Sequence, residues 1–309
     1  MFISICAKRR DSYSVIIILL LVIQMMACDS VDPETSAITT TASSKPPAAT
    51  TLAPTQTLSA SSKVPDPRPT DVPGNWWQPG LITSWQWQLA DPPVDQSFDV
   101  EMYDIDLFDN DTAIVAELHE QGRVVICYLN AGGWEDWRPD AAQFPASIIG
   151  QNLDGWTGEK WLDIRRLDLL GPVLEARLDL CRDKGFDGVE PDNVDGYLNE
   201  TGFPLTYQDQ LAFNIWLAEE AHQRGLSIGL KNDMEQIADL LPYFDWALNE
   251  QCFEYEECDT LLPFIQAGKP VFNVEYHLDT AEFCRQANTL NFNSLKKNLE
   301  VDAYREACR

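Results

Sequence analysis

Two hydrophobic patterns alternate along residues 75–309. Short apolar runs rich in β-branched and aromatic residues are followed by longer stretches whose apolar positions recur at helical spacing. The short runs predict strands at Leu81–Trp85, Val100–Ile105, Val124–Leu129, Trp161–Ile164, Gly188–Glu190, Ser227–Leu230, Trp246–Leu248 and Val271–Val274, with a further strand near Phe292. The longer stretches predict helices at Thr112–Gln121, Gly171–Lys184, Tyr207–Arg224, Met234–Leu241, Thr260–Ala267 and Thr280–Asn288.

Glycines connect several predicted helices to the strand that follows. The segments HEQGRVVICYL, CRDKGFDGVE, AHQRGLSIGL and IQAGKPVFNV each place a glycine between a polar helix end and an apolar run, which is typical of a helix C-cap. Repeated strand–helix units of about 25–30 residues indicate a parallel sheet, and about eight such units favour an α/β fold of the (β/α)8 TIM-barrel type. A doubly wound sheet is the alternative, although no GxGxxG sequence follows an early strand.

The first 74 residues carry a different pattern. Residues 1–28 combine a basic start with an apolar run up to residue 27, which predicts a secretory signal. Its end, Met-Met-Ala-Cys, resembles a bacterial lipobox in which Cys28 is lipidated, and an ordinary cleaved signal peptide is the alternative. Residues 29–74 are rich in Ser, Thr, Pro and Ala and predict a disordered linker. We therefore expect an exported monomer, anchored to a membrane through lipid or secreted, with one domain over residues 75–309.

Charge and cysteine content narrow the partners and the compartment. A formal net charge of −27 disfavours binding to nucleic acid or to anionic lipid head groups, and either solubility or a cationic ligand would explain it. Export predicts disulfides, and sequence proximity suggests Cys252–Cys258 and Cys284–Cys308. Cys127 lies in an apolar strand and is expected to be buried. Scattered cysteines without a CxxC pair and only three histidines argue against a zinc site, and no cofactor is expected.

The carboxyl ends of the predicted strands carry most of the reactive side chains. They read SWQWQ, YDIDLFD, LNAGGWEDW, LDIR, EPDNVDGY, KND, NEQCFEYEE and VEYH, and TIM barrels place their reactive groups at these ends. Acids and aromatic rings without a histidine or cysteine nucleophile suit a glycosidase. In such an enzyme one carboxylic acid protonates the leaving oxygen, and a second carboxylate attacks the sugar or activates water. Crowded carboxylates, such as the four in FDGVEPDNVDGY, also push one another's pKa values apart.

Several of these segments together resemble one family. The runs GFDGVEPDNVDGY, SIGLKND, WALNEQCFEYEEC and PVFNVEYH, with VICYLNAGGWEDWRPD and EKWLDIR before them, are similar to the domain of glycoside hydrolase family 114, the endo-α-1,4-polygalactosaminidases. The resemblance extends from about Trp76 to Cys308. It implies a (β/α)8 barrel that cleaves α-1,4-linked galactosamine polymers. The negative charge of the chain would attract such a cationic amino-sugar polysaccharide.

The resemblance also implies a catalytic pair. Matching of motif positions places the nucleophile or base at Asp192 and the general acid at Glu250. Glu190 lies two positions before Asp192 on the same strand face and is the alternative, whereas Asp195 is expected to cap or brace the loop. A separation of the two carboxylates near about 5 Å would indicate retention of anomeric configuration, and one well beyond about 6 Å would indicate inversion.

Other polar or aromatic strand-end residues are candidates for substrate binding. Asp104 and Asp106 alternate on YDID and share one strand face, where they would bind substrate amines or form a buried hydrogen-bonded pair. Lys231 is a candidate donor to substrate or a salt-bridge partner that restrains the acids. The remaining candidates are Asn130, Asp163 and Asn232 as polar contacts, and Trp85, Trp87, Trp134 and Tyr276 as sugar platforms, with core packing as the alternative for the tryptophans.

Three functions remain open at this point. A glycosidase that acts on an amino-sugar exopolysaccharide is favoured because both carboxylate positions of the resemblance are present. A non-catalytic carbohydrate-binding surface lipoprotein is the first alternative. A glycosidase for another glycan is the second, because one fold supports many specificities.

Overall fold

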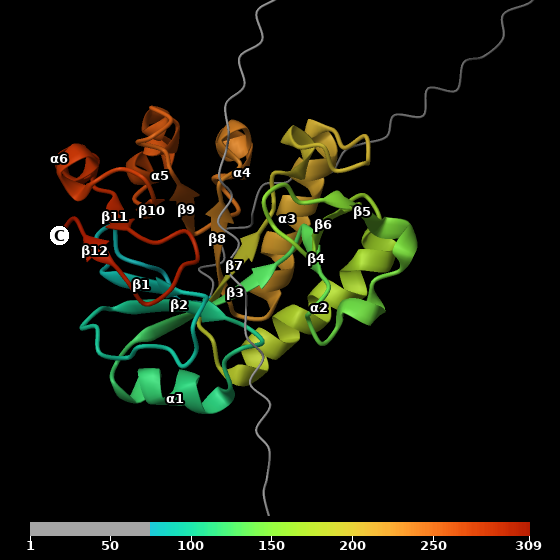
Figure 1. The fold of residues 1–309 in the computed structure, drawn as a ribbon, viewed down its shortest axis with the longest axis horizontal. Coiled ribbons are helices and arrows are strands. Elements are labelled where there is room, and N and C mark those ends of the chain that lie inside the picture. Colours follow the sequence, from blue (N-terminus) through green and yellow to red (C-terminus); the bar gives the residue numbers. More distant parts are fainter. Residues whose placement is uncertain (1–74) are drawn as a thin grey trace, which may run out of the picture. The chain divides into compact units, whose positions relative to one another are not determined.

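A curled nine-stranded sheet lies at the centre of residues 75–309, the part of the chain that this computed structural model describes (Figure 1). The predicted signal, Cys28 and the predicted linker lie outside the described residues. Eight parallel strands follow in the order β1 (Trp85–Gln88), β2 (Met102–Asp106), β3 (Val124–Asn130), β7 (Gly188–Asp192), β8 (Ser227–Lys231), β9 (Trp246–Glu250), β10 (Val271–Glu275) and β11 (Asn293–Lys296). The short β12 (Glu306–Ala307) pairs antiparallel with β11.

The two edges of this parallel sheet approach each other. The indole Nε1 of Trp85 in β1 donates to the backbone carbonyl of Asn293 in β11 at 2.8 Å, and the backbone N–H of Thr83 donates to the Oδ1 atom of Asn293 at 3.2 Å. Within the described residues these strands are joined through side chains and not through a backbone ladder. The sheet therefore curls on itself with the strand order expected for a (β/α)8 barrel.

One predicted barrel strand belongs to a different sheet. The sequence predicts a barrel strand at Trp161–Ile164, but β6 (Glu159–Leu162) pairs with β4 (Gly133–Glu135) and β5 (Ile149–Asn152) in a small antiparallel sheet. We call residues 133–162 the insertion sheet, which lies in the chain between β3 and the next helix. The segment near Phe292 supplies the eighth parallel strand instead. The prediction was wrong because a short apolar run has the same pattern whichever sheet it joins.

The helices agree closely with the predicted ones and surround the sheet (Figure 1). They are α1 (Thr112–Glu120), α2 (Leu167–Lys184), α3 (Tyr207–Gln223), α4 (Ile237–Leu240), α5 (Leu262–Gln266) and α6 (Thr280–Leu290), with the short 3-10 segments η1 (Ala141–Gln143), η2 (Ala146–Ile148), η3 (Gly196–Leu198), η4 (Met234–Gln236) and η5 (Cys258–Leu261). Local caps define several ends. Asp111 accepts hydrogen bonds from two backbone N–H groups at the start of α1, and Gly185 ends α2 at φ 91°. No helix of the described residues is both long and apolar enough to span a membrane.

The interior of the curled sheet is filled by large aromatic rings at its amino end. Trp85, Trp246 and Phe272 point inward, with the ring of Phe272 5.0 Å from that of Trp85 and 5.5 Å from that of Trp246. Gly229 makes this possible, because a Cβ atom there would lie 2.2 Å from the Trp246 ring. The alternate residues of the same strands pack outward against the helices. The aromatic layer closes the amino end, and the polar residues gather at the other end.

Three disulfides cross-link the described residues. The predicted pairs Cys252–Cys258 and Cys284–Cys308 are confirmed. Cys127 is buried as predicted, but it is also bonded to Cys181, which joins β3 to α2. Sequence proximity could not suggest this pair because the two cysteines are 54 residues apart and meet only when the helix packs on the strand.

Candidate active site

A cleft of about 1010 Å³ lies at the carboxyl ends of the parallel strands. Thirteen Asp and Glu residues line it, against two cations, Arg138 and Lys231. Both cations are already paired, since Arg138 lies 2.6 Å from Asp106 and Lys231 lies between Asp192 and Glu250. The cleft therefore carries a strong negative potential that attracts cationic ligands. Within residues 75–309 no group of three or more His, Cys, Asp or Glu side chains is arranged to hold a metal ion.

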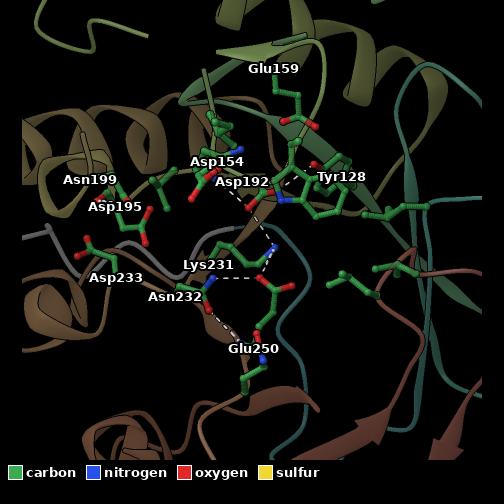
Figure 2. Close-up of a pocket in the computed structure, with 18 of the residues that line it drawn as sticks. Tyr128, Asp154, Glu159, Asp192, Asp195, Asn199, Lys231, Asn232, Asp233 and Glu250 are labelled. Atoms are coloured by element: carbon green, nitrogen blue, oxygen red, sulfur yellow. Dashed lines mark hydrogen bonds and ion pairs between the residues drawn. The ribbon is translucent and has the colours of Figure 1, made fainter. Parts of the chain in front are cut away.

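One ammonium group bridges the two predicted catalytic carboxylates (Figure 2). Lys231 Nζ lies 3.1 Å from Asp192 Oδ1 and 3.3 Å from Glu250 Oε2. The two carboxylate oxygens are therefore no farther apart than the sum of these distances. Asp192 ends β7 and Glu250 ends β9, so the intervening strand β8 supplies the lysine between them. The structure thus brings Asp192, Lys231 and Glu250 together.

Asp192 is held by three donors. Its Oδ2 atom accepts from the Tyr128 hydroxyl at 2.9 Å. Its Oδ1 atom accepts from Lys231 and, at 2.9 Å, from the backbone N–H of Asn193. Burial, followed by the charge of Asp192, raises the pKa of Tyr128 well above its usual range, so the phenol keeps the proton that it donates. Asp192 is half-buried and lines the cleft, so its orientation is fixed while it still faces a ligand.

Glu250 is held in a similar way from the other side. Its Oε2 atom accepts from Asn232 Nδ2 at 3.1 Å, and the Oδ1 atom of the same asparagine accepts from the backbone N–H of Glu250 at 3.0 Å. The Tyr276 hydroxyl donates to Oε1. Burial and the charge of Glu250 raise the pKa of this tyrosine well above its usual range. Asn232 and Tyr276, both predicted as substrate contacts, line the cleft and orient Glu250.

Lys231 is itself fixed by residues beneath the cleft. It donates to Glu190 Oε1 at 2.9 Å and lies 4.8 Å from the centre of the Trp87 ring, whose Nε1 donates to Glu190 Oε2 at 3.0 Å. Burial opposes the charge of Lys231, but Asp192, Glu190 and Glu250 together hold its pKa well above the usual range. The lysine is therefore a permanent ammonium that neutralises part of the carboxylate cluster.

Two of the predicted acidic contacts lie below the cleft. Glu190 is fully buried and covered by Lys231 and Trp87, so it does not line the cleft and cannot replace Asp192 at a ligand. Asp104 lies deeper, and neither of its oxygens meets a hydrogen-bond donor among the described residues. Burial and the charge of Glu190 raise the pKa of Asp104 well above its usual range, which makes it a carboxylic acid able to donate to Glu190. Asp104 is buried, but it does not form the expected pair with Asp106, whose two oxygens accept from Arg138.

Several other side chains predicted to contact substrate are bonded to, or packed against, other parts of the protein. Asp106 does line it, but both its oxygens accept from Arg138, at 2.9 and 2.6 Å. Asn130 accepts from the backbone N–H of Gly133 and from Asn193, which fixes the loops around Asp192. The remaining three are outside the cleft: Asp163 pairs with Arg165, Trp85 packs in the aromatic layer, and the Trp134 indole donates to the Ala141 carbonyl. Asp163 was misplaced because its segment was taken for a barrel strand.

Sequence reasoning missed the exposed aromatic rings of the cleft. Trp137 and Trp156 from the insertion sheet and Tyr255 from the loop after β9 are 52%, 48% and 62% exposed and line the cleft. Exposed rings at this position can stack on sugars. Trp156 stands in the polar turn NLDGWTGE, where no core is available to bury it, and that context was the one signal in the sequence.

A curled parallel sheet whose strand ends bear two neighbouring carboxylates, in a cleft with exposed aromatic rings, has the features of a glycoside hydrolase. The chain belongs to glycoside hydrolase family GH114, whose family model matches residues 67–309. This confirms the resemblance found in the sequence.

The chain is also similar to two solved structures and to one sequence relative. The crystal structure of Aspergillus fumigatus Ega3 in complex with galactosamine is 44% identical, covers 75% of this chain and 97% of that chain, and has a TM-score of 0.72. The glycoside hydrolase domain of PelA from Pseudomonas aeruginosa shares the fold, at 15% identity and a TM-score of 0.59, covering 73% of this chain and 98% of that chain. An uncharacterized protein of Deinococcus radiodurans is 27% identical over 202 residues, which span 57% of this chain and 65% of that protein.

Proposed function

We propose that the protein cleaves α-1,4-linked galactosamine-containing polysaccharide, with Asp192 as nucleophile and Glu250 as general acid. The observation that carries this proposal is the bridge that Lys231 makes between the two carboxylates inside a cleft with thirteen acids. Galactosamine bound to Ega3, at 44% identity, supports the substrate class. A cationic polymer also suits the negative cleft.

The proposed mechanism retains the anomeric configuration. Asp192 attacks the anomeric carbon while Glu250 transfers a proton to the departing glycosidic oxygen, and a covalent glycosyl–aspartate forms as that bond breaks. Glu250, now a carboxylate, then removes a proton from water, which releases the sugar from Asp192. The single ammonium group that contacts both carboxylates supports this course, because such a close spacing suits direct attack by Asp192 better than attack by an intervening water.

Cleavage within the polymer and export of the protein complete the proposal. The exposed aromatic rings come from both the insertion sheet and the β9 loop, which suits a chain that extends past the cleavage point on both sides. Three disulfides support an oxidising compartment outside the cytoplasm. Lipidation at Cys28 and the membrane anchor that it would provide remain predictions from the sequence.

The test compares wild-type chain with the variants Asp192→Asn and Glu250→Gln on de-N-acetylated α-1,4-galactosamine polymer. We expect each variant to lose at least about a hundredfold in kcat, because each removes a group that acts on the reacting atoms. The control Glu219→Gln removes an exposed carboxylate of α3 that does not line the cleft, and this variant should cleave normally. Product anomers followed by NMR should first appear in the α configuration. A wild-type protein that binds the polymer without cleaving it would favour the non-catalytic lipoprotein.

A further inference from the structure

The segment between β11 and β12, residues 297–305, forms one wall of the cleft. Three of its residues line the cleft, namely Leu299, Glu300 and Val301. Figure 1 shows the segment as the red loop beside β1, and we call it the strap. The backbone carbonyl of Val301 accepts from the N–H groups of Leu89 and Ala90, which follow β1, at 2.8 and 3.2 Å. The strap therefore joins the two edges of the main sheet beside the cleft.

Val301 is held in a costly backbone conformation. Its φ is 52°, in the left-handed region that β-branched residues rarely adopt. Its side chain is 6% exposed and belongs to the same apolar cluster as Trp87 and Tyr276, whose polar atoms donate to Glu190 and Glu250. Tertiary contacts offset the backbone cost while the strap is in place. Displacement of the strap would relieve that cost and would uncover two rings that hold the site.

Lys297, the first residue of the strap, is buried without a carboxylate partner. It is 1% exposed, and its Nζ atom donates to the backbone carbonyl of Asp302 at 2.6 Å and to Gln86 Oε1 at 3.4 Å. Both acceptors are neutral, and within residues 75–309 no Asp or Glu makes an ion pair with this lysine. Burial of an ammonium group with neutral partners alone costs free energy that burial of the neutral amine does not.

Asp302 and Arg305 are the charged groups that act on Lys297 from within the strap. The Asp302 carboxylate attracts the ammonium, but it already accepts from Asn298 Nδ2 at 2.9 Å and from the backbone N–H of Tyr304 at 3.0 Å. Arg305 repels the ammonium, and its own Nε atom is buried without an acceptor in the described part of the chain. Burial lowers the pKa of Lys297 to about 7, an effect that Asp302 opposes and Arg305 reinforces.

The strands packed against Lys297 present neutral groups or charges that are already paired. β1 contributes the amide of Gln86, and Lys296 at the end of β11 pairs with Asp279. Glu275 of β10 meets Lys297 through its backbone carbonyl, while its carboxylate accepts from N–H groups of the loop after β9. The surroundings of Lys297 therefore favour the neutral amine as long as the strap is in place.

We propose that the strap is a proton-controlled wall of the cleft, closed while the Lys297 amine is neutral and displaced toward solvent when that amine is protonated. In the displaced state the ammonium reaches water and Val301 leaves its left-handed conformation. The cleft then loses one wall, and solvent reaches Trp87 and Tyr276. The proposal goes beyond the proposed reaction, which uses no residue of the strap.

The pH range of this response follows from the two states of Lys297. Its pKa is about 7 under the strap against a usual 10.5 in water, so the displaced state binds more protons between these values. The population of the displaced state should therefore rise as pH falls from about 10 to about 7. Below that range Lys297 is protonated in both states and adds no further pH dependence.

The test measures hydrogen exchange of the Leu89 and Ala90 amides, whose acceptor is the Val301 carbonyl, in the full-length chain at pH 7 and pH 9. In wild type the protection of these amides, corrected for the intrinsic exchange rate, should rise about tenfold or more between the two pH values. Lys297→Met keeps a long side chain without a site for the proton, so its protection should change by less than about twofold. The matched control Lys296→Met removes the exposed neighbouring ammonium and should respond to pH as wild type does.

Two results would overturn the proposal. Equal protection of the wild-type amides at both pH values would mean that protonation does not move the strap, and a wild-type response in Lys297→Met would mean that another group controls it. Lys297→Gln is the second variant if Lys297→Met does not fold, because its uncharged amide can still donate to the Asp302 carbonyl and should give the same flat response. The exchange experiment does not depend on cleavage of the polymer, so the strap and the proposed function fail separately.

Discussion

Lys231 connects the carboxylates of the cleft to buried residues that do not line it. Its ammonium contacts Glu190 as well as Asp192 and Glu250, and Glu190 lies against the protonated Asp104. We therefore expect a substitution at Asp104 to alter the hydrogen bonding of Glu190 and, through Glu190, the position of the Lys231 ammonium. We therefore expect the positions of Asp192 and Glu250 to depend on Glu190 and Asp104.

Asp104 is expected to act as a positioning residue through its proton. Asp104→Asn keeps a donor toward Glu190, so its kcat should stay within about threefold of the wild-type value. Asp104→Leu leaves Glu190 with one donor fewer, so kcat should fall by about tenfold or more with little change in KM. Steady-state kinetics across pH would measure this, and the acidic limbs of the wild-type and Asp104→Asn profiles should coincide. Equal activity of the asparagine and leucine variants would contradict the expectation.

Asp233 is expected to make the fold less stable as pH rises. Its pKa is about 8 in the folded chain against a usual 3.8, so the folded state holds a proton that the unfolded state has released between those values. The unfolded state then binds fewer protons, and the free energy of unfolding falls as pH rises from about 4 to about 8. Asp233→Asn cannot ionise and should be more stable than wild type at pH 8 by about 2–4 kcal/mol.

Denaturant unfolding of both chains at pH 5 and pH 8 would measure the difference. The gap should be small at the lower pH and wide at the higher one. A gap of the same size at both would show that Asp233 does not carry the raised pKa. Residues that serve binding often make the fold less stable, so a gain in stability in Asp233→Asn is also the result that a binding role for Asp233 predicts.

At the residue scale, the sequence predicted the two carboxylates of the proposed reaction better than it predicted their neighbours. Asp192 and Glu250 were placed from motif position, and the structure brings them together. The segment FDGVEPDNVDGY contains no cation of its own. The cation that pairs with its acids, Lys231, comes from the next strand, some forty positions away in the chain. The burial of Glu190 and Asp104 depends on which side chains cover them, and the periodicity of the sequence does not report that.

Among the elements, the packing of β8 against β9 depends on one missing side chain. Gly229 in β8 leaves the space that the Trp246 ring of β9 occupies. Lys231 lies two residues further along β8, so a shift of this strand would also move the ammonium of the site.

Gly229→Ala should destabilise the fold by about 2–3 kcal/mol, because the added methyl overlaps the Trp246 ring and forces the strands apart. Gly171→Ala is the matched control. Gly171 lies within α2, and a Cβ atom there would come no closer than 3.6 Å to a neighbouring atom, on Trp216 of α3, so the variant should be neutral or gain up to about 1 kcal/mol. Thermal and denaturant unfolding would compare them. An unfolding midpoint of Gly229→Ala equal to that of wild type would contradict the packing argument.

Helices and parallel strands were predictable at the scale of elements because both patterns repeat and glycines mark the boundaries. The insertion sheet was not, since Trp161–Ile164 and the segment near Phe292 look alike as short apolar runs. The two segments differ in the strands with which they pair, and that pairing is set by the three-dimensional path of the chain. The error carried over to Asp163, which was assigned to a strand end that does not exist.

For the whole molecule, the net charge of −27 and the acid-rich cleft act in the same direction. We expect kcat/KM for the deacetylated polymer to fall about tenfold as ionic strength rises from about 0.05 M to about 0.5 M, because salt screens the attraction. The same titration with the acetylated polymer should stay nearly flat. Parallel salt dependences for the two polymers would show that long-range charge does not guide the substrate. Overall fold class and charge were readable from sequence because both are sums over many residues.

The exposed tryptophans of the cleft and its central carboxylates come from different parts of the fold. Asp192, Lys231 and Glu250 end consecutive strands of the main sheet, whereas Trp137 and Trp156 belong to a loop excursion between β3 and α2. We expect changes in the exposed part of that excursion to alter contacts with the ligand more than the carboxylates at the strand ends. Diversification toward new glycans would then accumulate in residues 133–162 while the ends of the central strands stay constant, and grafting this stretch between relatives becomes a route to redesigned specificity.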